Sequence, residues 1–490
     1  MAEYLHGAYG QINTIGSRVS TQSRSAIVYI GTAPVHTIAG GAAYVNKPVL
    51  VNNIAEARKK LGFSTDYASY TLCEAMDVHF VQKGVGPVIF INVLDPATHK
   101  KAQQGSKSLT PASGRIVIAG AEGIVLDSVK VGTKVLGTDY TISYNADKAV
   151  ITIQEISAGG LGTAAISVTY DEIDPSAVTS TNVIGSADGY GLNTGICAVA
   201  SVYQQTGYVP AFLAAPGWSS VPAVHAAMIE KSRSINGHWD AYVLADLPIH
   251  DGSAAVTLAT AATWKTEHGY VNENETVYFP MVAGTDGRKY HLSTLAAANL
   301  QELLVAQDGI PYKTASNTEC DIIENLYLGE NQTGRVYDDT LINNVLNQNG
   351  IASAAFVGGK WVLWGAHSAD YGQDSADNVN VSETNRMMLY YISNDFQIRR
   401  SADVDKPMTA NDIASIVAEE QARLDALKMI GAILYGECHL NAEMDTRSDI
   451  VKGDFSITFN VTTTPLAKSL TAVVNWTDDG FVTFYESFEQ

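Results

Sequence analysis

The residues best suited to catalysis are Asp246, His250 and the many serines of the chain. A serine hydrolase needs a serine nucleophile within hydrogen-bond reach of a histidine base, and a carboxylate that orients that base. The sequence contains no Gly-x-Ser-x-Gly elbow, no Gly-Thr-Ser nucleophile turn and no His-Gly-Thr segment. We therefore expect a protein that is not an enzyme.

Two other patterns could bind a cofactor or a metal. Gly189-Tyr-Gly191-Leu-Asn-Thr-Gly195 is close to a dinucleotide loop, but its third glycine comes one residue late and no clear strand precedes it. We interpret this loop as a hinge by which the chain re-enters its core. No CxxC pair, HExxH motif or EF-hand loop occurs, so we expect no cofactor, no metal and reduced thiols at the four cysteines Cys73, Cys197, Cys320 and Cys438.

Size and charge limit the partners. A chain of 490 residues with 46% hydrophobic residues predicts several domains. Its net charge of −20 disfavours nucleic acid and anionic membranes. Residues 1–120 hold eleven basic and six acidic residues, so the acidic excess lies in the remainder, a split that suits head-to-tail stacking. With no signal-like start and no long apolar run, we expect neither classical export nor a membrane anchor.

Alternating strands and helices predict an α/β core. Strands are expected at 26–30, 48–51, 87–93, 209–214, 241–245 and 276–282, and helical segments between them imply a largely parallel sheet covered on both faces. Asn52 or Asn53 can cap one helix, and Ser219 or Ser220 can cap the helix that begins near Pro222. His79 lies on the apolar face of the segment 67–83, where we expect it to be a core residue.

A change of period predicts a second unit. Between the polar linkers 99–113 and 174–189 the apolar residues alternate with a period of two, and strands are expected at 116–118, 124–126, 140–144, 150–153 and 166–170. We interpret this stretch as an inserted all-β domain.

The C-terminal region has a third character. Thr409-Ala-Asn-Asp412 has the form of a capping box and predicts a long helix that ends near Gly436. Strands are expected at 455–461 and 471–476, which makes an α+β domain.

Both ends of the chain are aromatic and poor in charge. Residues 4–10 are apolar, and residues 481–488 form a β-prone run after an Asp-Asp-Gly turn. An isolated strand is unstable in water, so each end must add to a sheet, in its own chain or in a neighbour. Pairing with neighbours would be head to tail, and such a contact generates a helical filament when it does not close.

Ordered motifs across the chain resemble the contractile tail sheath proteins of bacteriophages, R-type bacteriocins and related contractile injection systems. They are Tyr4-Leu5-His6-Gly7, the strand 26–30 with Gly31-Thr-Ala-Pro34, Asn46-Lys-Pro-Val-Leu-Val51, Phe212-Leu-Ala-Ala-Pro-Gly-Trp-Ser-Ser220, Ala245-Asp-Leu-Pro248 and Gly358-Gly-Lys-Trp-Val-Leu-Trp-Gly365. The chain departs from the family at Asn385-Arg386-Met387, where paired arginines are often found; Arg399-Arg400 comes later.

The resemblance implies a fold and a domain order. The fold is a mixed, largely parallel α/β core, subtilisin-like in outline, with an inserted all-β domain and a C-terminal α+β domain. The expected divisions are an N-terminal linking arm (1–24), the core (25–98 and 190–365), the inserted domain with its linkers (99–189), the sheath domain (366–477) and a C-terminal linking arm (478–490).

The resemblance also implies a function and partners. Subunits form stacked hexameric rings around a tail tube, exchange strands through both arms, and contract to drive the tube through a target envelope. The implied partners are other copies of the chain, the tube protein, and baseplate and tail terminator proteins. The implied location is the virion tail or a tail-like particle, assembled in the bacterial cytoplasm. The expected arm contacts are Tyr4, Leu5, Tyr9, Phe481, Val482, Phe484, Tyr485 and Phe488.

Two alternatives stay open at this point. A non-contractile surface or capsid-like protein would share the β module and the apolar ends, but not the ordered motifs. A serine hydrolase is the other, because the family core is described as subtilisin-like.

Overall fold

The computed structural model describes residues 25–329, 339–373, 378–441 and 447–481. A mixed sheet forms its centre, with six parallel strands and one antiparallel strand at each edge. In spatial order the strands are β19 (Lys360–Trp364), β18 (Ile351–Val357), β14 (Glu275–Tyr278), β11 (Tyr242–Asp246), β10 (Val209–Ala214), β1 (Ser25–Gly31), β3 (Val88–Asn92) and β2 (Pro48–Val51). Five of the six strands predicted from the sequence in this region are confirmed. The sixth, predicted at 276–282, is divided between β14, which ends at Tyr278, and a strand of a smaller sheet that begins at Met281.

Helices cover both faces of this sheet, because the strands are apolar on both sides. One layer contains α2 (Thr71–Met76), the π-helical turn Asp77–Gln82 and α7 (Leu292–Ala306). The other contains α3 (Ser180–Ile184) and α5 (Pro222–Lys231). The remaining helices of the core are α1 (Ile54–Lys60), α4 (Val202–Thr206), α6 (Ala261–Glu267) and α8 (Asp339–Leu341). Two small sheets add β12 (His250–Asp251) with β13 (Ala254–Ala255), and β15 (Met281–Gly284) with β16 (Lys289–Tyr290) and β17 (Ile323–Tyr327).

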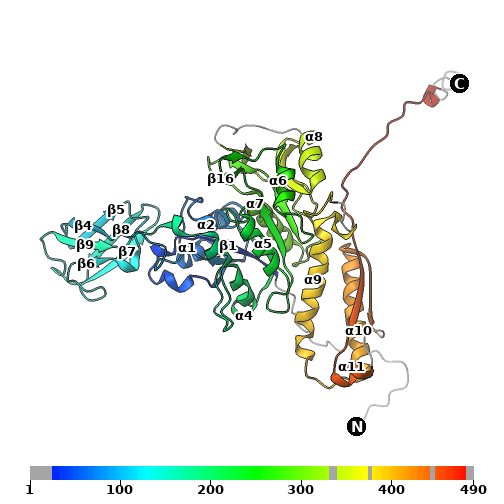
Figure 1. Cartoon of the computed structure of the whole chain (residues 1–490), viewed down its shortest axis with the longest axis horizontal. Coiled ribbons are helices and arrows are strands. Elements are labelled where there is room, and N and C mark those ends of the chain that lie inside the picture. Colours follow the sequence, from blue (N-terminus) through cyan, green and yellow to red (C-terminus); the bar gives the residue numbers. More distant parts are fainter. Residues whose placement is uncertain (1–24, 330–338, 374–377, 442–446, 482–490) are drawn as a thin grey trace, which may run out of the picture.

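A β-rich part projects from one end of the molecule (Figure 1). Its two three-stranded sheets enclose a core of their own. The strands are β4 (Gly105–Leu109), β5 (Arg115–Ala119), β6 (Lys130–Val131), β7 (Tyr140–Asn145), β8 (Val150–Glu155) and β9 (Ile166–Tyr170).

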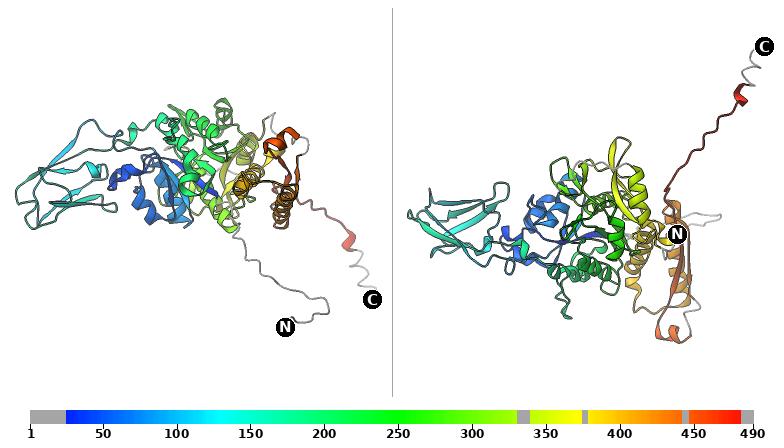
Figure 2. Two further views of the ribbon diagram at one scale, coloured as in Figure 1. Left: turned by 90° about the horizontal axis from the view of Figure 1, so that it is seen from below. Right: turned by 45° about the horizontal axis from the view of Figure 1, so that its top comes forward.

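The C-terminal part lies at the opposite end, where two long helices stand side by side (Figures 1 and 2). These are α9 (Glu383–Arg400) and α10 (Ala410–Met429). The antiparallel pair β20 (Ile433–Leu440) and β21 (Ile457–Thr463) packs on them, and α11 (Arg447–Lys452) lies between the two strands in sequence. Beyond β21 the described chain runs away from the body of the molecule (Figure 2).

Several local predictions are confirmed. Asn53 caps α1, since its side chain accepts from the Glu56 N–H. The capping box of Thr409 and Asp412 is present at the start of α10. His79 is fully buried, and its Nε2 lies 2.9 Å from the Tyr29 hydroxyl.

Other local predictions are wrong. The helix that was expected to reach Gly436 ends at Met429, because Gly431 adopts a left-handed conformation (φ +76°) and terminates it. Residues 124–126 contain no strand, while β4 lies in the polar stretch interpreted as a linker. Neither Ser219 nor Ser220 caps α5, whose N-cap residue is Val221. Residues 471–476 form no strand within the described chain.

Candidate assembly surface

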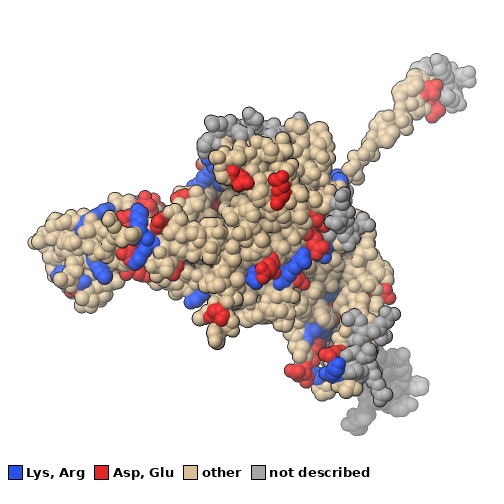
Figure 3. All heavy atoms as spheres, in the orientation of Figure 1, with Lys and Arg blue, Asp and Glu red and all other residues tan. Residues whose placement is uncertain are grey.

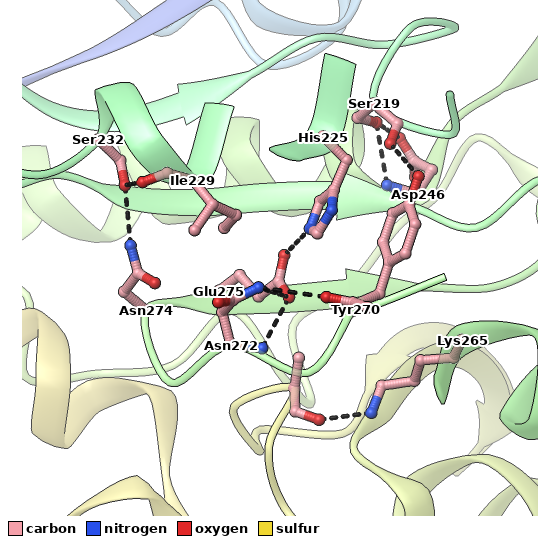
Figure 4. Close-up of polar contacts among 12 residues, drawn as sticks. Ser219, His225, Ile229, Ser232, Asp246, Lys265, Tyr270, Asn272, Asn274 and Glu275 are labelled. Carbon is pink, nitrogen blue, oxygen red and sulfur yellow. Dashed lines mark hydrogen bonds and ion pairs between the residues drawn. The ribbon is translucent and has the colours of Figure 1, made fainter. Parts of the chain in front are cut away.

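The buried polar residues of the core do not form a hydrolase site (Figure 4). The Ser219 hydroxyl accepts from the Asp246 N–H at 3.0 Å. Within the described chain no histidine lies beside this hydroxyl to act as its base, because the nearby His225 binds Glu275 instead, at 2.5 Å from Nε2 to Oε2. His250 lies exposed on β12, and its side chain is not part of this network. The described residues therefore lack the paired nucleophile and base of a triad.

Asp246 belongs to a second buried cluster, which is structural. Its Oδ1 accepts from the Ser293 N–H at 3.0 Å, and burial raises the pKa of its carboxyl group. Nearby, His291 Nδ1 lies 2.8 Å from Glu74 Oε2. Burial lowers the pKa of His291, but the Glu74 carboxylate outweighs that effect and raises it to about 9. This pair fastens the start of α7 to α2.

The glycine loop at 189–195 and the four cysteines were the other candidates for binding a cofactor or a metal. Gly189-Tyr-Gly191 follows the helix α3 rather than a strand, and the Asp188 carboxylate accepts from the N–H groups of Tyr190 and Leu192. All four cysteines are free thiols. Among the described residues, no group of three or more His, Cys, Asp or Glu side chains could hold a metal ion. Within the same part of the chain no helix combines the length and apolarity needed to cross a membrane.

Ion pairs join α9 to α10. Glu420 of α10 is 1% exposed in its side chain, and it accepts from Arg399 at 2.5 Å and from Arg400 at 2.6 Å. Asp395 of α9 is equally buried and accepts from Arg423 of α10 at 2.5 Å. These pairs offset part of the cost of burying the two carboxylates, and they connect α9 to α10.

The hairpin of β20 and β21 packs its apolar face on these helices. Cys438 and Ile433 are buried there, and the Phe459 ring lies edge-on to Phe396 of α9 at 5.5 Å between centroids. Gly436 allows the close approach, since a Cβ at this position would lie 2.9 Å from Leu424 Cβ of α10. The opposite face of the hairpin is exposed at Glu437 and His439.

The outer edges of the hairpin can be identified from its ladder. The Asn441 N–H donates to the Ser456 carbonyl at 2.8 Å, so the backbone groups of odd-numbered residues in β20 face β21. In this register the backbone N–H and C=O groups of Asn460 face β20, while those of Phe459 and Val461 face outward. No strand of the described residues pairs with either outer edge. An unpaired edge is a template for another strand.

The segment after β21 is extended and apolar. Pro465 follows the strand, and residues 464–477 contain no helix or strand. Leu470, Val473, Val474 and Trp476 are between 79% and 91% exposed. Each would contribute about 2 kcal/mol if it were buried. Exposed apolar side chains in such a row mark an interaction segment.

Only one of the eight predicted arm residues lies within the described residues. Phe481 is 55% exposed and belongs to a helical turn at 479–481, where a strand was expected. Tyr4, Leu5, Tyr9, Val482, Phe484, Tyr485 and Phe488 lie outside the described residues. From the sequence, 465–477 was assigned to the sheath domain and a strand was expected at 471–476; the exposure of the apolar run 470–476 was not predicted, although Pro465 and the run itself can be read from the sequence.

Basic and acidic side chains are interspersed on the face of the molecule seen in Figure 3. At the base of the β-rich part, Lys100 pairs with Asp171 and Lys101 with Glu172, each at 2.7 Å. These exposed pairs contribute little to stability.

No protein-family model matches the chain. A curated relative is the tail sheath protein of Burkholderia phage BcepMu, which is 27% identical over 503 aligned positions that cover 98% of both chains. The similarity therefore extends over nearly the whole chain.

Solved structures share the fold. A chain of the anti-feeding prophage baseplate matches with a TM-score of 0.56 at 13% identity, covering 98% of this chain and all of that one. A chain of the contracted helical sheath of the anti-feeding prophage matches with a TM-score of 0.55 at 12% identity and the same coverage. The sheath tail protein of Desulfitobacterium hafniense matches with a TM-score of 0.52 at 13% identity, over 90% of this chain and 94% of that one.

Proposed function

We propose that this chain, which belongs with the contractile tail sheath proteins, is a structural subunit that polymerises around a tail tube and contracts to drive the tube through a target envelope. The full-length similarity to a phage tail sheath protein supports this function. So does the common fold with a sheath in its contracted state. The single observation in the structure that carries the proposal is the presence of an open-edged hairpin and an exposed apolar segment in the same subunit.

These two features are complementary. The hairpin has two outer edges, and the chain has two apolar ends, so an N-terminal arm from one copy and a C-terminal arm from another can each find an edge. The contact is head to tail and open, which generates a filament of stacked hexameric rings. Tyr4, Leu5 and Tyr9 would anchor the first arm, and Phe481, Val482, Phe484, Tyr485 and Phe488 the second. Residues 465–477 would span up to roughly 45 Å between the body and that anchor.

Contraction needs no cofactor in this proposal. Two packings of identical subunits can differ in free energy, and a bistable interface that repeats along a filament releases that difference when it is triggered. The core, subtilisin-like in outline, would move as a rigid body without catalysis, while the strand exchange persists. Residues 99–189 would form an inserted domain on the outside of the sheath.

We infer further partners from the same assembly. The tube protein would lie inside the sheath, with baseplate and tail terminator proteins at its ends, in a virion tail or tail-like particle built in the host cytoplasm. Negative-stain electron microscopy of the purified protein tests the proposal. Tubes or stacked rings would support it, and a protein that stays monomeric at all concentrations and ionic strengths would contradict it.

A further inference from the structure

A side-chain amide occupies part of one hairpin edge. Gln421 of α10 accepts from the Cys438 N–H through Oε1 at 2.9 Å, and its Nε2 donates to the Gly436 carbonyl at 3.1 Å. Both backbone groups belong to the outer edge of β20, because the odd-numbered residues of this strand face β21. The amide therefore satisfies one donor and one acceptor that an added strand would use.

The orientation of this amide is fixed by its surroundings. Its acceptor oxygen faces an N–H group, while its nitrogen has acceptors at the Gly436 carbonyl and at Asp425 Oδ1, the latter at 3.3 Å. If the amide were flipped, its oxygen would face both the Gly436 carbonyl oxygen and the Asp425 carboxylate oxygen, and both contacts would be repulsive. Close packing of α10 on Gly436 brings the side chain within reach of the strand.

The two edges of the hairpin consequently differ. The β20 edge is closed at its centre, whereas no side chain of the described residues makes a comparable bond to the outward backbone groups of Phe459 and Val461 in β21. Natural sheets protect unpaired edges in several ways, since an open edge invites indiscriminate pairing.

We propose that Gln421 closes the β20 edge in the free subunit, so that the arm of a second copy adds first at the β21 edge, and that the amide is displaced when another arm adds at β20. This inference rests on the proposed strand exchange and specifies its order. The occupant is an arm of this chain, because the C-terminal segment leaves the body with the apolar side chains of 470–476 exposed and with no strand of the described residues beside it. Gln421 acts here as a gate against premature polymerisation.

Hydrogen exchange of the free protein tests the closed edge. In Gln421→Ala, mass spectrometry of a peptide that contains Cys438 should show exchange of its amide roughly tenfold faster, as expected for the loss of one hydrogen bond. Ser415→Ala, at an exposed position of the same helix, is the matched control and should leave that exchange unchanged. Unchanged exchange in Gln421→Ala would overturn the closed edge, whether or not the protein assembles.

Assembly kinetics test the gate. By light scattering, Gln421→Ala should shorten the lag before tube growth by roughly threefold to tenfold, whereas Ser415→Ala should keep the wild-type lag. In Gln421→Glu the side chain can still accept from the Cys438 N–H but cannot donate to the Gly436 carbonyl, so this variant should give an intermediate lag. The glutamate variant replaces the alanine variant in this test if the alanine variant folds poorly. An unchanged or longer lag in a folded variant, with wild-type tubes forming normally, would overturn the gate alone. Failure of the wild type to form tubes would instead contradict the proposed function.

Discussion

Lys468 Nζ donates to the Tyr371 hydroxyl at 2.6 Å, a contact between the C-terminal segment and the body of the subunit. The ammonium group also lies 4.9 Å from the centroid of the same ring. Beyond it, the apolar side chains from Leu470 to Trp476 are exposed. The packing of the body therefore does not use these four side chains.

The arm should matter for assembly and not for folding. Trp476 is 80% exposed, so Trp476→Ser should change the free energy of unfolding by less than about 0.5 kcal/mol. If Trp476 becomes buried in a neighbour, its loss should raise the critical concentration for assembly at least about tenfold, as measured by sedimentation. Leu192→Ser, at a site 77% exposed outside both arms, is the control and should affect neither quantity. Equal effects of the two variants would contradict the role of the arm.

The β21 edge should tolerate a proline in the free subunit but not in the polymer. Val461 has no N–H bond to β20, so Val461→Pro should leave the hairpin folded and remove a donor needed by an added strand. The melting temperature should fall only modestly, through lost packing of the partly buried Val461 side chain, and tube formation should be lost. Asn460→Pro is the matched comparison, because it removes a ladder bond to β20 and should lower the melting temperature. Tubes of normal stability from Val461→Pro would rule out strand addition at this edge.

The buried carboxylate between α9 and α10 should be more important than its exposed neighbour. Glu420→Ala removes the buried carboxylate that Arg399 and Arg400 share, so that Arg399 keeps only Asp395 and Arg400 keeps only partly exposed partners, and it should cost about 3 kcal/mol in urea unfolding. Glu419→Ala removes an exposed pair to Arg400 at 3.0 Å and should cost less than about 1 kcal/mol. Similar costs for both variants would show that the network does not hold the helices together.

Sequence reasoning succeeded where local and tertiary preferences agree. The parallel core strands are continuous apolar runs such as 27–30, and the α10 capping box is purely local, so both were predictable. It failed at 471–476, which has the composition of a strand but no partner within the described chain. A strand requires a neighbour, and the sequence of one subunit does not say where that neighbour comes from.

The polar contacts of Gln421 and of Glu420 could not be predicted from the sequence either. Gln421 and Gly436 are separated by a helix end and a turn, and their contact depends on how α10 packs on β20. The sequence shows Arg399-Arg400 after the departure from the family pattern at Asn385-Arg386-Met387, but the partner of these arginines, Glu420, follows only from the packing of α9 on α10.

The His291–Glu74 pair predicts a pH dependence. A histidine with a pKa of about 9 when folded and 6.5 when unfolded contributes stability that is complete below pH 6.5 and is lost as the pH rises to 9. The full contribution is about 3 kcal/mol. The difference in free energy of unfolding between wild type and His291→Gln should therefore shrink between pH 6.5 and pH 9.5. A difference that stays constant over this range would show that His291 is neutral in the folded protein.

The most direct test of strand exchange between copies is electron microscopy of two proteins side by side, the full chain and a chain that lacks residues 469–490. The full chain should form tubes or stacked rings, and the shortened chain should give the same circular dichroism spectrum and remain monomeric. Tubes from the shortened chain, with the same diameter and subunit repeat, would contradict the claim that the C-terminal arm joins the subunits.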